Sequence, residues 1–359
     1  MAAINLQNDE YKKGKYPIFL GEQLGLVDTI NVSYPLVEKN YLQQRKQMWS
    51  ESEVTLEQSR KDFITCSKNN YDVMIKNLSY QWSADSLAKS IITLFAPFIT
   101  NNEVATAMDF QSTMEIIHSR TYSEIIRQCI PDPEVVFEDI RKNKAIFDRL
   151  ETVEGILGDL AEAGHKYSLG LIEKDDKLRL LLIKGLVALV ALEGIQFMSS
   201  FSATFAMSEQ QLFMGACKLI GKILLDEALH SHLDLILIEG LLKEPEWKSV
   251  YDANLPELKQ ILDDVVASEE EWAEYLFSEG RYVLGLNAEL MKEWLWYNAT
   301  PIYRKLGIKY DFRGVKSNPL PWMEKWTNPD SVQNANQEIQ TTAYQLNITS
   351  SALDEDFDF

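Results

Sequence analysis

The chain is short of residue types that would mark several common protein classes. Three of its 359 residues are cysteine, Cys66, Cys129 and Cys217, and no Cys-x-x-Cys pair occurs, so we expect no disulfide framework and a reducing compartment. Positive charge is also scarce, with 35 Lys and Arg against 54 Asp and Glu and a formal net charge of −19. This balance disfavours nonspecific binding to nucleic acid, which depends on cationic side chains that neutralise phosphates.

Long hydrophobic runs are missing as well. The most apolar stretch, residues 185–192, is bounded by Lys184 and Glu193 and is too short to span a bilayer. The N-terminus has neither a basic start nor an apolar segment, so no signal peptide is predicted. Because 46% of the residues are hydrophobic, the chain can still bury a sizeable core. We therefore expect a cytoplasmic protein with no membrane segment.

Helical periodicity dominates the chain, and alternation with a period of two is almost absent. The pattern predicts an all-α fold of about eight long helices. Residues 1–35 are interpreted as an N-terminal arm, residues 36–327 as a helical domain and the Asn-, Gln- and Ser-rich residues 328–359 as a flexible tail. The clearest predicted helices cover residues 36–49, 54–95, 101–127, 178–205 and 209–239. Ser50 and Glu53 form a candidate capping box at the start of the second.

Two Glu-x-x-His motifs indicate a metal site. Glu115 and His118 form the first, and Glu227 and His230 form the second. Residues three apart lie on one face of a helix, so both side chains of a pair can reach one ion. In helix bundles, two such helices face two others that each give one carboxylate, and together they hold two ions.

The two further carboxylates are assigned with unequal support. Glu193 lies within the apolar run of residues 189–195, where an ionised carboxylate needs a partner. By itself it could equally be protonated, paired with a lysine or bound to metal; the accompanying motifs favour metal. Asp85, between Trp82 and Leu87, could lie on an ordinary exposed turn of helix.

Not every Glu-x-x-His sequence indicates a ligand pair. Glu162 and His165 repeat the spacing, but Gly164 and polar neighbours surround them, so we expect this pair at the surface. His232, which lacks a Glu three residues before it, is interpreted as structural. A carboxylate-rich, histidine-poor ligand set suits iron or manganese better than zinc.

A phenol lies close to the first motif along the helix. Tyr122 follows His118 by four residues and shares its face, so it is either a core tyrosine or a redox-active group beside the metals. Phe197 and Phe201 follow Glu193 at helical spacing and would form a dry lining, a simple core or both. Two redox ions beside an apolar pocket suggest dioxygen chemistry.

The chain resembles the small, radical-generating subunit of class I ribonucleotide reductase, a ferritin-like family. The resemblance runs from about residue 36 to the C-terminus and is most specific at residues 115–122, 191–197 and 226–230. It implies a ferritin-like helical bundle with additional helices. It also implies two iron ions, with dimanganese or a mixed Mn/Fe pair as alternatives, and a stable radical on Tyr122. The implied ligands are Asp85, Glu115 and His118 for one ion and Glu193, Glu227 and His230 for the other.

The same resemblance implies a path for the radical. Trp49, Asp226 and His118 would connect the metal centre to the surface, and Tyr344, assisted by Glu338, would relay the radical to the large (alpha) subunit. The acidic residues 353–359, with two Phe anchors, resemble a docking peptide for that subunit. The family also implies a homodimer. One departure is Leu225, where many relatives have Arg, and this questions any role for a positive charge beside Asp226.

Two other functions are compatible with the ligand motifs. A stand-alone ferritin-like dimetal oxidase would use the same site, but it needs neither Tyr344 nor an acidic tail. A non-enzymatic iron store or helical assembly protein is disfavoured by the length of the chain, since such stores need four helices. The sequence therefore predicts the radical-generating subunit.

Overall fold

The computed structural model describes residues 4–5, 7–8, 16–22 and 25–328. Within these ranges the regular structure is helical, and β-pairing is limited to isolated bridges between Phe19 and Ile99 and between Val283 and Leu286. The predicted all-α class is confirmed. Among the described helices, none combines the length and the apolar character that a membrane crossing needs.

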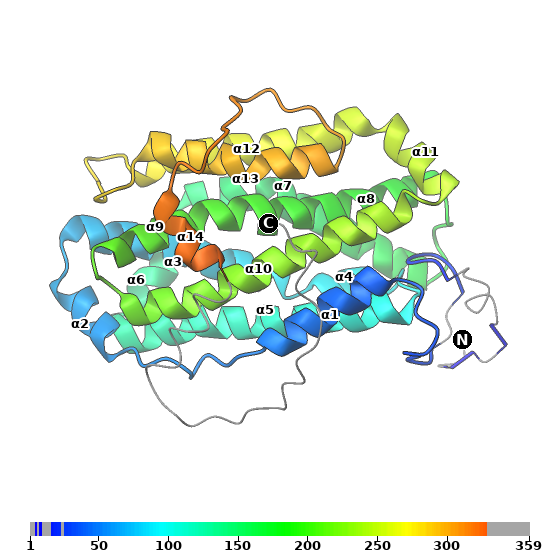
Figure 1. The fold of residues 1–359 in the computed structure, drawn as a ribbon, viewed down its shortest axis with the longest axis horizontal. Helices are drawn as coiled ribbons and strands as arrows, with labels where there is room; N and C mark the ends of the chain where they lie inside the picture. The colour runs from blue at the N-terminus through cyan, green and yellow to red at the C-terminus, as the bar shows by residue number, and fades with distance from the viewer. Residues whose placement is uncertain (1–3, 6, 9–15, 23–24, 329–359) are drawn as a thin grey trace.

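The helices follow one another along the chain, and the longest connection between described elements, residues 306–320, joins α13 to η3 (Figure 1). They are α1 (Pro35–Gln47), α2 (Glu57–Thr65), α3 (Lys68–Ala88), α4 (Ile91–Phe95), α5 (Asn102–Cys129), α6 (Glu134–Lys142), α7 (Lys144–Ser168), α8 (Asp176–Ala191), the π-helical segment η2 (Leu192–Gln196), α9 (Phe197–Glu209), α10 (Met214–Leu241), α11 (Pro245–Ala253), α12 (Leu255–Leu276), α13 (Ala288–Lys305), the 3₁₀ turn η3 (Pro321–Met323) and α14 (Glu324–Thr327).

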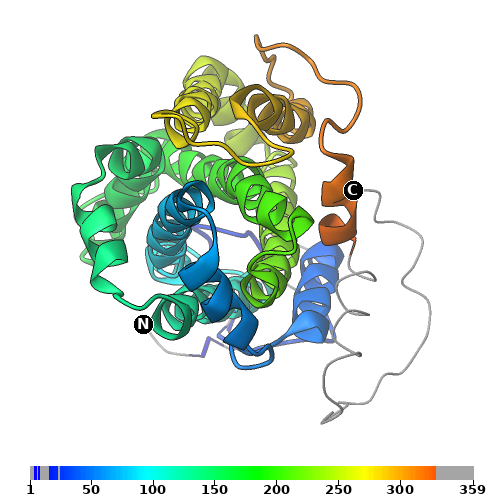
Figure 2. The same ribbon diagram turned by 90° about the vertical axis from the view of Figure 1, so that its left-hand side faces the viewer.

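The centre of the molecule is a four-helix arrangement. Its members are α3, α5, α10 and the continuous helix made of α8, η2 and α9, and each packs against its neighbours in that order. Figure 2 views these helices end-on, packed side by side. Helix α1 lies against α5 and α10, while α7, α12 and α13 cover the side of the α8–η2–α9 helix. The four central helices are those that carry the two motifs and the two added carboxylates.

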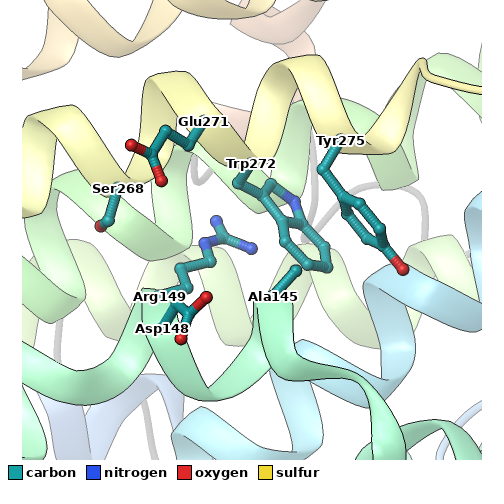
Figure 3. Close-up of a pocket in the computed structure, with 7 residues that line it drawn as sticks. All are labelled: Ala145, Asp148, Arg149, Ser268, Glu271, Trp272 and Tyr275. Atoms are coloured by element: carbon teal, nitrogen blue, oxygen red, sulfur yellow. The ribbon is translucent and has the colours of Figure 1, made fainter.

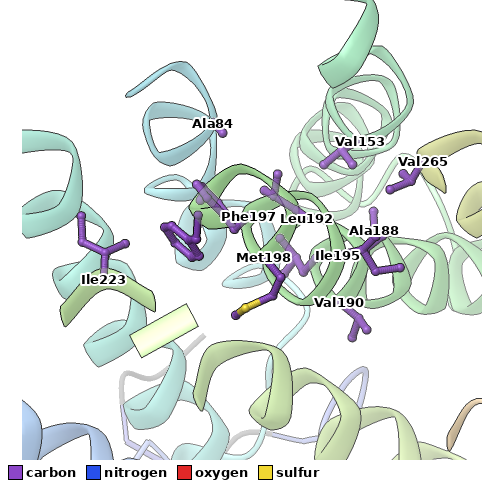
Figure 4. Close-up of a cluster of buried hydrophobic side chains, with 14 of the residues drawn as sticks. Ala84, Val153, Ala188, Val190, Leu192, Ile195, Phe197, Met198, Ile223 and Val265 are labelled. Atoms are coloured by element: carbon purple, nitrogen blue, oxygen red, sulfur yellow. The ribbon is translucent and has the colours of Figure 1, made fainter. Parts of the chain in front are cut away.

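Apolar side chains fill the space around the α8–η2–α9 helix. Figure 4 shows Leu192, Ile195 and Phe197 from this helix together with Val153 of α7 and Val265 of α12. All of them are buried. Because residues 185–208 of this helix are buried almost throughout, they can only be stable in the interior of the bundle. The polar side chains within this stretch, such as Glu193 and Gln196, are therefore forced into a dry environment.

Helix α5 forms where the sequence predicts it. The Asn101 side chain accepts hydrogen bonds from the backbone N–H groups of Glu103 and Val104, which caps the N-terminus of the helix. The helix ends at Cys129, just before Pro131, which cannot continue a helix. This 28-residue helix holds Glu115, His118 and Tyr122 in its middle.

The predicted helix over residues 54–95 is wrong in its start and its continuity. The Glu53 side chain accepts the Ser50 backbone N–H at 3.0 Å, but that bond closes a turn, and α2 begins only at Glu57. Cys66 then takes an extended backbone conformation, and Ser67 caps a separate α3 by accepting the Asn70 N–H. Period and composition alone do not reveal such a short break, because both pieces keep helical spacing.

The predicted helix over residues 178–205 exists, but it contains the π-helical turn η2. Here the Phe197 N–H reaches the carbonyl of Leu192, five residues back. Gly194 lies in this turn, and a Cβ atom added there would come within 2.6 Å of Ser231 Oγ and 2.7 Å of Ile302 Cδ1. Glycine therefore allows η2 to approach α10 and α13 closely.

Helix α10 starts at Met214 rather than at residue 209. Gln211 and Phe213 both have positive φ, 58° and 54°, which interrupts the helix between α9 and α10. The Phe213 backbone N–H donates to Asp62 Oδ2 at 2.8 Å, so α2 stabilises this turn. The interruption lets α10 return beside α9, and this brings Glu227 and His230 back towards Glu193.

Candidate metal centre

Six side chains converge in the middle of the four central helices. Asp85 comes from α3, Glu115 and His118 from α5, Glu193 from η2, and Glu227 and His230 from α10. All six are fully buried. The ligand atoms fall into two groups in which every atom lies within 4.8 Å of the others. One group is Asp85, Glu115, His118 and Glu227, and the other is Glu115, Glu193, Glu227 and His230.

Glu115 and Glu227 belong to both groups, so each can bridge two ions. His118 Nδ1 lies 3.0 Å from Glu227 Oε1 and 3.4 Å from Glu115 Oε2. On the other side, His230 Nδ1 lies 2.7 Å from Glu115 Oε1. The centroids of the two imidazole rings are 5.7 Å apart. This arrangement gives two adjacent ion positions with one histidine each.

Most buried polar atoms of this cluster lack hydrogen-bond partners among the described residues. They include both carboxylate oxygens of Asp85, Glu115 and Glu227 and the Nδ1 atoms of His118 and His230. Unpaired polar atoms in a dry interior cost free energy, on the order of 1–3 kcal/mol each. Four carboxylates carry the charge that neutralises two divalent ions, and oxygen-rich ligation with few histidines suits iron or manganese. The residues present therefore fit a two-metal centre.

Proton affinities in the cluster are strongly perturbed. Burial raises the pKa of Glu193 well above its usual range, and the neighbouring charge of Asp234 adds to this. Burial would lower the pKa of His230, but Glu115 and Glu227 outweigh it and raise that pKa to about 10. Conversely, burial would raise the pKa of Glu115, but the charges of His118 and His230 lower it. Without metal, a proton on Glu193 and the protonated histidines beside Glu115 thus offset charge in the cluster, and bound ions would replace these protons.

Two polar residues at the centre escaped the sequence analysis. Asp234 is fully buried, and burial raises its pKa to about 8. Gln111 donates from Nε2 to Glu193 Oε1 at 2.9 Å. Asp234 follows His230 by four residues within the apolar run of residues 233–238, so the argument applied to Glu193 would also have selected it. Gln111, an uncharged residue, left no comparable signal.

Tyr122 lies beside the carboxylates with its side chain fully buried. Burial raises the pKa of its phenol well above the ordinary value, and the charges of Asp85 and Glu227 add to this. The phenol therefore keeps its proton at neutral pH. Phe197 and Phe201 are also fully buried and stack at 5.7 Å between ring centroids, as part of the dry core predicted for them.

A chain of contacts leads from the centre to the loop between α1 and α2. His118 Nε2 lies 3.0 Å from Asp226 Oδ2, and Trp49 Nε1 donates to that same oxygen at 2.7 Å. The Trp49 and His118 rings stack with 6.0 Å between centroids and 18° between planes. Because Asp226 engages Nε2, the His118 Nδ1 atom is left facing the metal site.

A positive charge is present near this path despite Leu225. The Lys222 ammonium lies 5.8 Å from the centroid of the Trp49 ring and 2.8 Å from Glu53 Oε2. Lys222 precedes Asp226 by one helical turn, so the cation reaches the tryptophan from the turn before. Leu225 itself is buried, with 8% of its surface exposed.

The remaining sequence predictions fall outside the centre. Glu162 and His165 are exposed on α7, as predicted for the third Glu-x-x-His pair. Tyr344, Glu338 and the docking segment 353–359 lie outside the described residues.

Comparison with known proteins gives a consistent family. The family model for the ribonucleotide reductase small chain matches residues 27–319. The beta subunit of ribonucleoside-diphosphate reductase from Haemophilus influenzae is 30% identical, with 98% of this chain and 96% of that protein covered. The R2 subunit from Clostridium botulinum superposes with a TM-score of 0.79 at 20% identity, over 91% of this chain and 98% of that one. The dimanganese(II) protein from Streptococcus sanguinis superposes with a TM-score of 0.69 at 17% identity, over 84% and 99%.

Proposed function

The chain belongs to the family of ribonucleotide reductase small chains, and from this we propose that its metal centre generates a radical that Tyr122 stores and Trp49 transmits. It has the function of the beta subunit of a ribonucleoside-diphosphate reductase, built around a buried carboxylate–histidine dimetal site. The roles of individual residues are the proposal. The observation that carries it is the continuous set of contacts from the ligand His118 through Asp226 to Trp49.

The ligand roles follow from the geometry of the two groups. Asp85 and His118 would hold one ion, Glu193 and His230 the other, and Glu115 and Glu227 would bridge them. When bound, the two ions would let dioxygen act as the oxidant that removes an electron and a proton from a phenol. Iron is the first proposal for both positions, and manganese is the second because the oxygen-rich ligand set accepts either.

Tyr122 is proposed as the residue that keeps the oxidised state. Its phenol is fully buried, so water is excluded from it. The charge of Asp85 helps to raise the pKa of the Tyr122 phenol, so the two groups are neighbours. The Asp85 carboxylate can therefore accept the phenolic proton when the ring is oxidised. The buried apolar side chains of α9 protect the oxidised Tyr122 ring from solvent.

Asp226 is proposed to couple the motion of electron and proton along the path. One oxygen of Asp226 contacts both the Trp49 N–H and the His118 ring, so it can take a proton from the indole while the electron moves between the stacked rings. The contact also fixes the ring orientation of His118, as carboxylate partners of metal-bound histidines do.

Asp226→Asn tests this path. The amide keeps the shape but removes the negative charge that accepts the indole proton. We expect the Tyr122 radical to form, measured by EPR, while ribonucleoside-diphosphate reduction with a class I large subunit falls on the order of 10²-fold. Asp109→Asn, an exposed acid on the same helix as His118, serves as the control with unchanged turnover. Full turnover in Asp226→Asn would exclude the proposed coupling.

A large subunit is the partner implied by the family, and the C-terminal tail is proposed as its docking element. The tail is acidic and carries Phe357 and Phe359, which suit a segment that orders on binding. Tyr344 is proposed to relay the radical across this interface, with Glu338 assisting. Two copies of the chain are proposed to associate as a homodimer.

Removing residues 345–359 should separate radical formation from turnover. We expect the truncated protein to keep its EPR signal. Its affinity for the large subunit should fall by about 30-fold or more, because at least one aromatic residue that dominates binding is lost. A control with Asn334→Ser and Asn336→Ser alters the tail but keeps the Phe residues, and it should bind normally. Equal binding by the truncated protein would favour the stand-alone oxidase instead.

A further inference from the structure

A buried ion pair lies outside the metal centre, between α7 and α12. Arg149 Nη2 donates to Glu269 Oε2 at 2.6 Å, and Nε contacts the other carboxylate oxygen, so the pairing is bidentate. The exposed fractions of the two residues are 2% and 0%. Buried ion pairs commonly stabilise a fold no better than apolar residues of the same size. A role in global stability is therefore a poor explanation for this one.

The pair is connected to the π-helical turn by reciprocal hydrogen bonds. Arg149 Nη2 also donates to the Gln196 carbonyl at 3.2 Å, and Gln196 Nε2 donates to the Arg149 carbonyl at 2.7 Å. Gln196 is the last residue of η2, three residues after Glu193. The Arg149 guanidinium thus adds a side-chain donor to the backbone at the C-terminal end of the turn.

Aromatic rings fix the orientation of the guanidinium. Its central carbon lies 3.4 Å from the centroid of the Tyr80 ring and 4.6 Å from that of the Trp272 ring. Arg149 and Trp272 also line a cavity of about 140 Å³ between α7 and α12, where Figure 3 shows the guanidinium beside the indole. With rings against it and a carboxylate along one edge, the guanidinium holds a single orientation.

We propose that Arg149 and Glu269 are positioning residues of the metal centre, which hold η2 in its π-helical form and thereby set the place of Glu193. The inference rests on the dimetal site described above. Arg149 and Glu269 lie on α7 and α12, two helices that supply no ligand among the described residues, so they support η2 from outside the ligand cluster. Residues that contact a ligand's surroundings in this way can orient the ligand without touching the ion.

The test replaces the pair by apolar residues, Arg149→Met with Glu269→Leu, and measures Mn(II) binding by EPR of the free ion. It is run in two backgrounds, Asp85→Ala, which keeps the Glu193 side of the site, and Glu193→Ala, which keeps the Asp85 side. We expect affinity to fall about tenfold in the first background and to stay unchanged in the second. Amide hydrogen exchange in residues 192–197 should accelerate. The melting temperature should not fall, because an apolar replacement of a buried pair is neutral or stabilising.

One control variant and one second test variant accompany the double substitution. Tyr251→Phe removes a buried hydrogen bond from α11 to the Leu306 carbonyl at the end of α13, outside both α7 and α12, so it should change the melting temperature without changing Mn(II) affinity. Glu269→Gln keeps the shape of the site and is measured alongside in case the double variant does not fold; it should weaken the Glu193 side in the same direction. Equal Mn(II) affinity of both variants and the parent, or equal weakening on both sides, overturns the inference. Failure of the parent to bind two ions would instead overturn the dimetal site itself.

Discussion

Tyr122→Phe is expected to abolish the stored radical and to lower ribonucleotide reduction on the order of 10³-fold or more, while leaving the metal centre loaded. The substitution removes one oxygen from a fully buried side chain and keeps the ring, so the packing of α5 against α3 is preserved. Without the hydroxyl there is no phenolic proton for Asp85 to accept. EPR of the oxygen-exposed, metal-loaded protein measures the radical, and a coupled assay with a large subunit measures turnover.

Tyr80→Phe is the matched control for this prediction. Tyr80 is also a fully buried tyrosine, and burial likewise raises the pKa of its phenol. Its ring packs against Arg149, and phenylalanine keeps that ring, so the loss of the hydroxyl should leave the radical intact. A radical signal that survives in Tyr122→Phe and disappears in Tyr80→Phe would show that Tyr80, not Tyr122, stores the radical.

Substituting Glu115 or Glu227, the carboxylates shared by both ligand groups, should weaken the binding of two ions, whereas substituting an unshared carboxylate should weaken one. Glu115→Ala is expected to weaken both ions, on the order of 10²-fold or more, because Glu115 belongs to both ligand groups and contacts His230 as well as His118. Asp85→Ala and Glu193→Ala should each weaken one ion and spare the other. Titration with Mn(II), followed by the EPR signal of the free ion, gives the number bound by each variant.

Charge provides a second reason for this difference. The ligand set carries four carboxylates, so each removal leaves the remaining ions less well neutralised. In Glu115→Ala the deficit lies between the two ions, whereas in Asp85→Ala it lies at one end. If Glu115→Ala bound one ion as tightly as Asp85→Ala does, a bridging role for Glu115 would be rejected.

The local features of the centre were accessible from the sequence. Glu115 with His118, and Glu227 with His230, need nothing but helical spacing to share a face, and their apolar flanks predict burial. Glu193 could be selected because a carboxylate inside an apolar helix requires a partner. Asp85 has no such flanks, and it was assigned through the family resemblance.

Contacts between distant segments were less accessible. The bond from Trp49 to Asp226 joins residues 177 positions apart, and no periodic pattern indicates it. The same holds for Gln111 against Glu193, which depends on how α5 packs against η2. The π-helical turn also left no signal, because Gly194 can serve either a regular helix or a close approach. Such features arise from tertiary packing, which overrides local preference.

The π-helical turn has a consequence for how the longest apolar part of the chain must be read. Successive residues of an α-helix are rotated by about 100° around its axis, so one additional residue shifts the helical phase by that amount. Residues before Leu192 and after Gln196 therefore belong to two different helical wheels, and a single wheel drawn through both would assign inward and outward faces wrongly to one of them. Deleting one residue within the turn would restore regular α-helical bonding and place both segments on one helical wheel, so that α9, including Phe197 and Phe201, would keep its present neighbours.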